Sequence, residues 1–409
     1  MTNARDPAVE SPYAWLRLGV ALLMGTIGGV GLWSFVVALP VIQAEFQVTR
    51  AEASLPYTWG MLGLMLGGIV MGRLSDRLRI FLPALLGSVM LGIGYLLLAG
   101  AESLIGFTII YAVAICAVGS AALFSPLVAD TSLWFDRRRG IAVALVASGN
   151  YFAGTIWPPI LQPAMEAWGW RTTSLGIGLF CLVTLVPLAF VLRRPAPVTP
   201  QPRAMTASAT REAARPLGLP PNALQALLMF AGVACCIAMS MPQVHIVAYC
   251  TDLGYGAARG AEMLSLMLLT GTISRLLFGL VMDRIGGTGT LLLGSVLQMV
   301  ALALFLPFDG LASLYVISAL FGLFQGGIIP SYAMIVREVF PAQQAGTRVS
   351  LALSATLAGM AIGGWMSGAI FDLTGTYRAA VLNGIAWNAV NLAIAAWLFL
   401  RVRQRLAYA

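Results

Sequence analysis

The feature that most constrains this chain is a series of about twelve apolar runs, most of them near the length of a membrane-spanning helix. An α-helix needs about 20 consecutive apolar residues to cross the hydrocarbon core of a bilayer. Only 10% of the 409 residues are charged, whereas a soluble domain carries roughly 25%. Too little charge remains to cover a water-facing surface. The sequence therefore excludes a large soluble enzyme and predicts a polytopic membrane protein.

The apolar runs must form helices, because open strands in lipid would leave backbone polar groups without partners. We therefore expect an all-α membrane protein with twelve transmembrane helices. The expected spans lie near residues 14–40, 54–74, 81–101, 105–133, 139–160, 172–192, 223–249, 258–281, 289–307, 311–334, 348–371 and 378–400.

One long polar segment divides this series into two sets of six spans. Residues 193–222 are rich in proline, alanine and arginine and can neither span a bilayer nor pack. We expect residues 1–192 to form an N-terminal six-helix bundle and residues 193–222 to form a cytoplasmic linker. Residues 223–409 would then form a C-terminal six-helix bundle.

The arginines between the runs gather on one side of the predicted membrane. Only Arg50, Arg171, Arg259 and Arg378 fall in short loops on the other side, where acidic residues accompany them. Cytoplasmic loops carry the excess of positive charge, so we expect the arginine-rich side and both termini to be cytoplasmic. The net charge of +8, reached without any lysine, thus reflects membrane orientation and not nucleic-acid binding.

The two halves share a sequence repeat at an offset of 207 residues. MGRLSDRLR, at 71–79, aligns with FGLVMDRIG, at 278–286, and Trp170-Arg171 aligns with Tyr377-Arg378. Parallel repeats of this kind enclose a substrate site near the bilayer midplane, at the interface of the halves. Charged positions shared between the halves are Asp76 with Asp283, and Arg77 with Arg284.

The chain resembles the major facilitator superfamily in three features. These are the twelve spans, their division into six and six, and the loop with a shared Gly, Asp and Arg after spans 2 and 8 (residues 71–79 and 278–286). The segment LWFDRRRGIAVALVASGNYFAG, at 133–154, resembles the fifth-span signature of the monocarboxylate-porter branch and its bacterial oxalate:formate relatives. The resemblance implies a monomeric secondary transporter in a bacterial inner membrane. Such a protein moves a small organic anion by rocking its two halves around the site.

Arg275 stands within the eighth apolar run, and the repeat places Gly68 at its equivalent position. An unpaired charge at the bilayer centre costs at least ~2.5–3.5 kcal/mol, so something must offset it. One explanation is a buried ion pair with an acid on another span. The other is a carboxylate substrate, which a planar guanidinium binds in bidentate fashion. The branch uses an arginine four residues before the loop glycine to hold its anion, and Arg275 stands four before Gly279.

Charge counting narrows the expected substrate to a monoanion, a short or aromatic monocarboxylate. Oxalate porters add a lysine on the eleventh span, and here residues 350–368 contain no basic residue. The animal members of the branch place an aspartate four before the arginine and a lysine on the first span. Here Gly271 and Trp33 take those places. The animal proton relay is therefore in doubt, although the substrate itself could be carried with a proton.

His245 and Asp130 are the candidates for proton coupling. An imidazole ordinarily titrates near neutrality, but His245, near the outer end of the seventh span, could instead be a hydrogen-bonded histidine at the rim. For Asp130 we favour an ion pair with the cluster Arg137–Arg139. Tyr332, on the tenth span, could donate its hydroxyl to an anion beside Arg275. Further candidates for substrate binding are Asn150, Tyr151, Trp33 and Tyr57, and other polar wall candidates are Trp157 and Gln243.

Asp76 and Asp283, each followed by an arginine (Arg77, Arg284), are expected to act as gates at the cytoplasmic ends of spans 2 and 8. The sequence contains no Walker loop, metal-ligand cluster or Ser-His-Asp grouping. We therefore expect no cofactor, no metal and no enzymatic activity. Two alternatives to monocarboxylate transport remain, an efflux pump of the same fold for amphipathic compounds and a membrane sensor that binds a solute without moving it.

Overall fold

The computed structural model describes residues 9–196, 217, 219–340 and 342–408, and these are helical almost throughout. The chain divides into two compact units. The first contains the described residues within Met1–Val48 and Leu55–Gln201, and the second contains Thr49–Ser54 and the described residues within Pro202–Ala409. The short segment 49–54 therefore belongs to the second unit, although its neighbours in sequence belong to the first.

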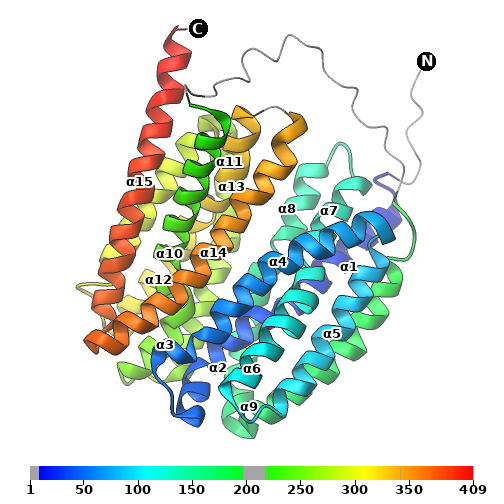
Figure 1. Ribbon diagram of the computed structural model, residues 1–409, viewed down its shortest axis with the longest axis vertical. Coiled ribbons are helices and arrows are strands. Elements are labelled where there is room, and N and C mark those ends of the chain that lie inside the picture. The colour runs from blue at the N-terminus through cyan, green and yellow to red at the C-terminus, as the bar shows by residue number, and fades with distance from the viewer. Residues whose placement is uncertain (1–8, 197–216, 218, 341, 409) are drawn as a thin grey trace. The chain divides into compact units, whose positions relative to one another are not determined.

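The helices of the two units are labelled in Figure 1. The first unit contains α1 (Pro12–Gly28), α2 (Val30–Phe46), α4 (Leu55–Leu78), α5 (Phe81–Ala99), α6 (Leu104–Ile110), the π-helical segment η1 (Tyr111–Ser120), α7 (Ser125–Trp134), α8 (Arg139–Ala147) and α9 (Gly149–Val191). The second contains α3 (Arg50–Ala53), α10 (Pro221–Asp252), α11 (Ala257–Leu304), α12 (Leu311–Gln325), α13 (Ile328–Val339), α14 (Ala342–Thr374) and α15 (Tyr377–Tyr408).

Within the described residues, ten helical segments are long and apolar enough to cross a membrane. The prediction of a multi-pass, all-helical protein is thus confirmed. Two of the ten segments, Ile141–Val191 and Ala257–Leu304, contain 51 and 48 residues, which is about twice the length of one crossing. Each is interrupted by a glycine with non-helical backbone angles, Gly169 (φ 75°, ψ 160°) and Gly286 (φ 71°, ψ 176°).

The backbone repeats its left-handed residues at the spacing found in the sequence. A positive φ is uncommon outside glycine and marks a special turn or helix end. Six of the nine such residues in the described part of the chain form pairs that are 207 residues apart in number. The pairs are Glu10 (φ 55°) and Leu217 (54°), Gln47 (52°) and Gly254 (82°), and Arg79 (61°) and Gly286 (71°). The chain therefore changes direction at matching positions in the two units.

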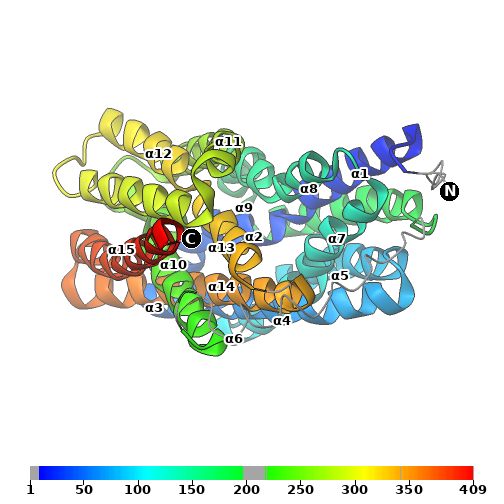
Figure 2. The same ribbon diagram turned by 90° about the horizontal axis from the view of Figure 1, so that it is seen from above.

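Glycines let α10 and α14 of the second unit approach closely. Helix α10 packs along α14 and α15, and Figures 1 and 2 show it running beside both. A Cβ atom added at Gly359 or Gly363 of α14 would lie 2.5 Å from the carbonyl oxygen of Val233 or 2.7 Å from the Cα of Ile237, both on α10. Small residues at such contacts are typical of helix packing in membranes.

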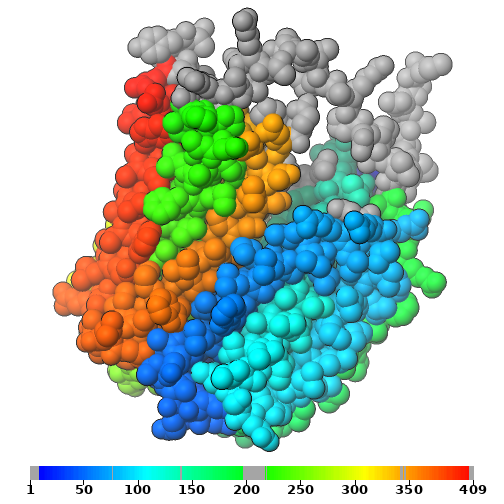
Figure 3. Space-filling model, viewed as in Figure 1, coloured from blue at the N-terminus to red at the C-terminus, as the bar shows by residue number. Residues whose placement is uncertain are grey.

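Large apolar side chains cover the outside of the helices. In Figure 3 the side chains of α4 and α6 fill the gaps that the ribbons leave within the first unit. Many of these outer residues are exposed, such as Leu66 (58%), Ile105 (73%) and Val183 (72%). A surface of this kind is expected to face lipid and not water.

Candidate functional site

Arg275 lies on α11 in the part of the helix that precedes Gly286. At 1.5 Å per residue, about 16 Å of helix separates the two residues. The side chain is half-buried. The backbone at this point lies against the break between α12 and α13, because the N–H of Gly326 donates to Ser274 Oγ at 3.1 Å. A Cβ atom at Gly326 would stand only 2.8 Å from the Arg275 nitrogen, so glycine permits this approach.

Two buried glutamines meet next to this break. Gln243 Nε2, on α10, donates to Gln325 Oε1, at the end of α12, at 2.8 Å. The side chains are only 5% and 1% exposed. The Nε2 group of Gln325 has no hydrogen-bond partner among the described residues, and a buried donor in that state costs about 1–3 kcal/mol. Gln243 was a predicted wall residue, whereas sequence reasoning missed Gln325.

His245 is fully buried within the second unit and does not lie at a rim. Its Nε2 atom lies 2.8 Å from the carbonyl oxygen of Gly364, and its Nδ1 atom lies 3.0 Å from the hydroxyl oxygen of Tyr377. The same hydroxyl accepts a hydrogen bond from Arg50 Nη1 at 2.9 Å. Arg50 also pairs with Asp252 at 3.2 Å. Sequence reasoning treated Arg50 only as a loop charge, because nothing local links it to residues about 200 positions away.

The hydroxyl of Tyr332, which the sequence led us to expect beside a bound anion, is hydrogen-bonded within the second unit. It donates to Asn391 Oδ1 at 2.8 Å, and Asn391 Nδ2 donates in turn to Ser295 Oγ at 2.8 Å. Tyr332 is fully buried. A tyrosine hydroxyl has one hydrogen to donate, and here Asn391 holds it. The residue connects three helices of the second unit.

The candidates in the first unit lie on α2, α4 and α9. Trp33 Nε1 donates to the carbonyl oxygen of Asn150 at 2.9 Å, so the structure brings these two predicted residues together. Tyr57 and Tyr151 are buried, at 2% and 6% exposure, and Tyr57 stacks on Phe35. Asn150 is half-buried. A role of these residues in substrate binding stays a prediction.

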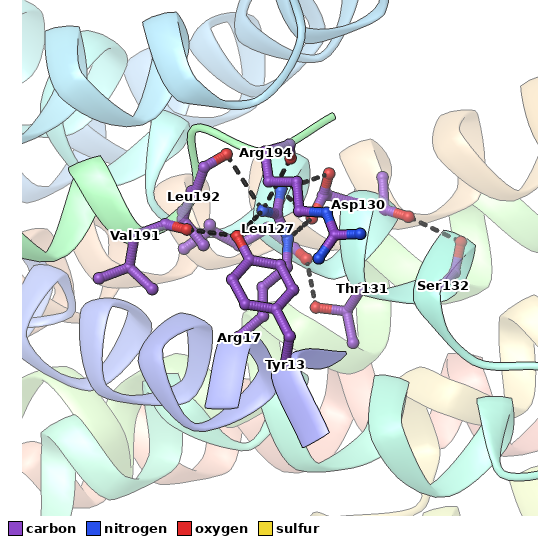
Figure 4. A network of polar contacts seen from close by, with 10 residues as sticks. Tyr13, Arg17, Leu127, Asp130, Thr131, Ser132, Val191, Leu192 and Arg194 are labelled. Atoms are coloured by element: carbon purple, nitrogen blue, oxygen red, sulfur yellow. Dashed lines mark hydrogen bonds and ion pairs between the residues drawn. The ribbon is translucent and has the colours of Figure 1, made fainter. Parts of the chain in front are cut away.

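The partner of Asp130 is Arg17, and the expected pairing with Arg137–Arg139 is wrong. Figure 4 shows the Arg17 guanidinium beside Asp130, with Nε and Nη2 donating to the carboxylate at 2.9 and 3.1 Å. Its Nη1 group donates to the carbonyl oxygens of Leu192 and Arg194, both at 3.1 Å. Arg17 is 2% exposed.

Sequence reasoning missed Arg17, although a usable signal existed. Arg17 and Asp130 are opposite charges that each stand inside an apolar run. Buried charges are usually paired, so the two could have been matched on that ground alone.

The predicted gate residues stand at helix ends. Arg77 lies one residue before the end of α4, and Asp283 and Arg284 lie shortly before Gly286. All three side chains are exposed. The side chain of Asp76 lies outside the described residues. The gating role therefore stays a prediction.

Comparison with known proteins gives a family and several relatives. A sequence model described as the Major Facilitator Superfamily matches residues 21–317 and 263–407. Monocarboxylate transporter 13 of Rattus norvegicus is 24% identical, over 93% of this chain and 87% of its own length. The MFS-type transporter pynF of Aspergillus niger is 25% identical, over 76% of this chain and 70% of its own.

Solved structures share the fold at low identity. A bacterial homologue of the human lysosomal transporter Spinster, inward-facing and unoccupied, gives a TM-score of 0.73 at 15% identity and covers 97% of this chain and 98% of its own. The nucleoside transporter NupG gives 0.71 at 13% identity, with coverage of 95% and 99%. These similarities concern the fold alone.

Proposed function

Because the chain belongs to the Major Facilitator Superfamily and is therefore a transporter and not an enzyme, we propose that it moves a small organic monocarboxylate across the membrane by alternating access. In this proposal the chain crosses the bilayer twelve times, with Gly169 and Gly286 each separating two crossings. The arginine-rich ends of the helices face the cytoplasm of a bacterium. The substrate travels with a proton.

The observation that carries the proposal is the placement of Arg275. The residue lies well inside an apolar helix and beside a glycine break, and its repeat equivalent is Gly68. A structural role that both units need would therefore not explain the presence of Arg275. A guanidinium offers a planar fork of donors that matches a carboxylate, and such charge-assisted bonds are strong where water is scarce.

Two buried polar side chains of the second unit likewise have apolar equivalents in the first unit. The repeat equivalents of Gln243 and His245 are Val36 and Ala38. The amide pair beside the α12–α13 break offers an additional donor, Gln325 Nε2. A substrate with one carboxylate and a second hydrogen-bond acceptor suits this set of groups. The names of the animal relatives, monocarboxylate transporters, support the same substrate class.

Efflux of amphipathic compounds is the alternative, and one relative favours it. The agnestins efflux protein AgnL12 of Paecilomyces divaricatus is 23% identical over 66% of this chain and 60% of its own length. An efflux pump for such compounds would bind mainly through apolar and aromatic contacts. Loss of Arg275 would then have little effect on ligand binding.

A thermal-shift screen of the purified protein against carboxylates, amines and neutral solutes tests the proposal. We expect monocarboxylates to stabilise the wild type, because a ligand that binds only the folded state raises its stability. Arg275→Ala should weaken this binding about 30-fold or more, as expected when one partner of a desolvated charge pair is truncated.

Arg259→Ala provides the matched control, because Arg259 lies on the same helix in an exposed pair with Glu262. It should leave carboxylate binding unchanged. Stabilisation by amines alone, or by carboxylates equally in Arg275→Ala, would contradict the proposal. The first result would instead favour the efflux alternative.

A further inference from the structure

The short helix α3 is docked onto the second unit by its backbone. Both oxygens of Asp372 accept backbone N–H groups at the start of α3, from Arg50 at 2.9 Å and from Ala51 at 2.7 Å. A Cβ atom at Gly368 would lie 2.8 Å from the Arg50 carbonyl oxygen. Helix α3 stands in sequence between α2 and α4, whose residues belong to the first unit. This docking accounts for the place of α3 in the second unit.

The Arg50 side chain extends this docking into the buried interior. Its guanidinium is bonded to Asp252 of α10 and to the hydroxyl of Tyr377 of α15, and it lies 4.8 Å over the ring of Phe371. Arg50 is 6% exposed and Tyr377 is 2% exposed. Charge-assisted hydrogen bonds are strong where water is scarce, and the Arg50–Tyr377 bond lies in the buried part of this contact.

The directions of the hydrogen bonds follow from the donor inventory. The Gly364 carbonyl can only accept, so His245 Nε2 carries a hydrogen and donates to it. In a neutral imidazole the other nitrogen, Nδ1, must then accept. Tyr377 therefore donates its hydroxyl hydrogen to Nδ1, and its oxygen accepts from Arg50 Nη1. The three hydrogen bonds that link Arg50, Tyr377, His245 and Gly364 can all form only while His245 is neutral.

A proton on Nδ1 of His245 reverses one link of this series. The imidazolium would donate to the Tyr377 oxygen, which already accepts from Arg50, and the Tyr377 hydrogen would lose its acceptor. Two cations would also share one oxygen atom. The charged or titratable groups around His245 and Tyr377 are Arg50 on α3, Asp252 and Tyr249 on α10, and Asp372 on α14. Both carboxylates bond to α3, and within the described residues neither is hydrogen-bonded to the Tyr377 hydroxyl.

We propose that His245 is a proton-binding site whose occupancy releases α3 from the second unit. The proton comes from the aqueous phase and binds Nδ1, and no other covalent bond changes. Its binding weakens the Arg50–Tyr377 hydrogen bond, so a protonated protein holds α3 less tightly than a neutral one. This inference rests on the proposed function only for its consequence, the coupling of a proton to transport.

Accessibility of Ser54 reports the release. Ser54 follows α3 directly and is fully buried, and the five native cysteines are all buried. We would measure the rate at which a maleimide labels Ser54→Cys in the purified protein between pH 8 and pH 5. Dividing by the rate for Glu102→Cys, which is exposed in a loop of the first unit, removes the titration of the thiol itself.

The expected result is a rise of this ratio by about tenfold or more as the pH falls, which corresponds to the loss of one charge-assisted hydrogen bond. His245→Gln should abolish the pH dependence and keep labelling slow, because an amide supplies both an acceptor and a donor but binds no proton. Tyr377→Phe should label rapidly at every pH, because it removes the hydroxyl that Arg50 and His245 share.

The repeat supplies a matched control. Trp170→Phe alters the residue equivalent to Tyr377 in the first unit and should leave the Ser54→Cys ratio and its pH dependence unchanged. A ratio that is flat with pH in the wild-type background, or that rises equally in His245→Gln, would overturn the inference.

The labelling uses no substrate, so its outcome is independent of the carboxylate screen. Carboxylate binding with a flat ratio would remove the proton site and leave the proposed function standing. A pH-dependent ratio without carboxylate binding would support the proton site and contradict the proposed function.

Discussion

Glu45 and Asp252 occupy equivalent positions in the two units, 207 residues apart in number, yet they bind different partners. Glu45 accepts hydrogen bonds from Trp170 Nε1 and from the Arg171 guanidinium, both in its own unit. Asp252 pairs instead with Arg50 of α3. Tyr377, the equivalent of Trp170, bonds to Arg50 and His245.

The difference shows that equivalent positions of a repeat can make different contacts. In the first unit Glu45 binds Trp170 and Arg171 of the same unit and so connects helices within it. In the second unit the equivalent residue, Asp252, binds Arg50 of α3, a helix whose neighbours in sequence belong to the first unit. The exchange of Trp170 for Tyr377 supplies the hydroxyl that connects Arg50 to a histidine. Gln243 and His245 of the second unit also stand where the first unit has apolar residues, Val36 and Ala38.

The largest expected effect comes from the ion pair that is most deeply buried. Arg17 and Asp130 are 2% and 10% exposed at their side chains, against 8% and 32% for Arg50 and Asp252. Removing one partner of a buried pair costs about 3–5 kcal/mol. We therefore expect Asp130→Asn to lower the thermal stability of the purified protein far more than Asp252→Asn, for which an exposed acid suggests about 1 kcal/mol.

A double variant checks that the loss comes from the charge left behind. Arg17→Met combined with Asp130→Leu removes both charges and should recover much of the stability lost in Asp130→Asn. If the double variant is no more stable than the single one, the pair stabilises the first unit through its geometry and not through charge balance. Equal losses of thermal stability in Asp130→Asn and Asp252→Asn would show that burial does not rank the two ion pairs.

An intermediate effect is expected from two buried tyrosines, one in each unit. Tyr332 donates to Asn391, and Tyr95 bonds to Ser34 and to the Val30 carbonyl. Replacing either by phenylalanine leaves a buried polar group unsatisfied, at about 1–3 kcal/mol. Both variants should show similar losses of thermal stability and unchanged carboxylate binding. Binding that weakens only in Tyr332→Phe would restore this hydroxyl to the substrate site.

The smallest expected effect is a pH dependence confined to the first unit. Glu10 accepts the backbone N–H groups of Arg138 at 2.9 Å and Asp136 at 3.3 Å, which lowers the pKa of Glu10 from its ordinary value. A lowered pKa in the folded state contributes stability above the unfolded pKa, and this stability is lost as the pH falls through the folded value. The equivalent residue in the second unit is Leu217, which cannot titrate.

Hydrogen exchange at the amides of Asp136 and Arg138 measures this contact. Their protection, relative to the Glu10→Ala variant, should be present near neutral pH and be lost as the pH falls through the lowered pKa of Glu10. Protection that is the same in both proteins at every pH would show that Glu10 does not hold the loop.

The sequence predicted the helical membrane fold and the repeat because both depend on local composition and on matching segments. Apolar runs of spanning length reveal helices, and the motif at 71–79 and 278–286 reveals the offset. The ion pairs were not predictable in the same way. Arg17 and Asp130 are separated by 113 positions, and Arg50 and Asp252 by 202. Hydropathy identifies a span but not the face that each side chain occupies.

The site residues illustrate the same limit. Arg275 was singled out because a fixed charge in an apolar run is visible in the sequence, and its role in substrate binding stays a prediction. The commitment of Tyr332 to Asn391 depends on how three helices of the second unit are rotated. The buried amide of Gln325 was missed because a single glutamine near the end of an apolar run carries no distinguishing signal.

The π-helical segment η1, from Tyr111 to Ser120, has a consequence for anyone who draws a helical wheel of this span. Its hydrogen bonds reach one residue further than those of an α-helix, so each residue turns through a smaller angle about the axis. The angular phase of the side chains beyond Ser120 is therefore shifted, and the non-helical backbone at Phe124 (φ −122°, ψ −81°) changes it again before Asp130. A wheel drawn at a constant pitch from residue 104 onward would aim that carboxylate at the wrong neighbour, whereas the α-helical α12 of the second unit introduces no such error.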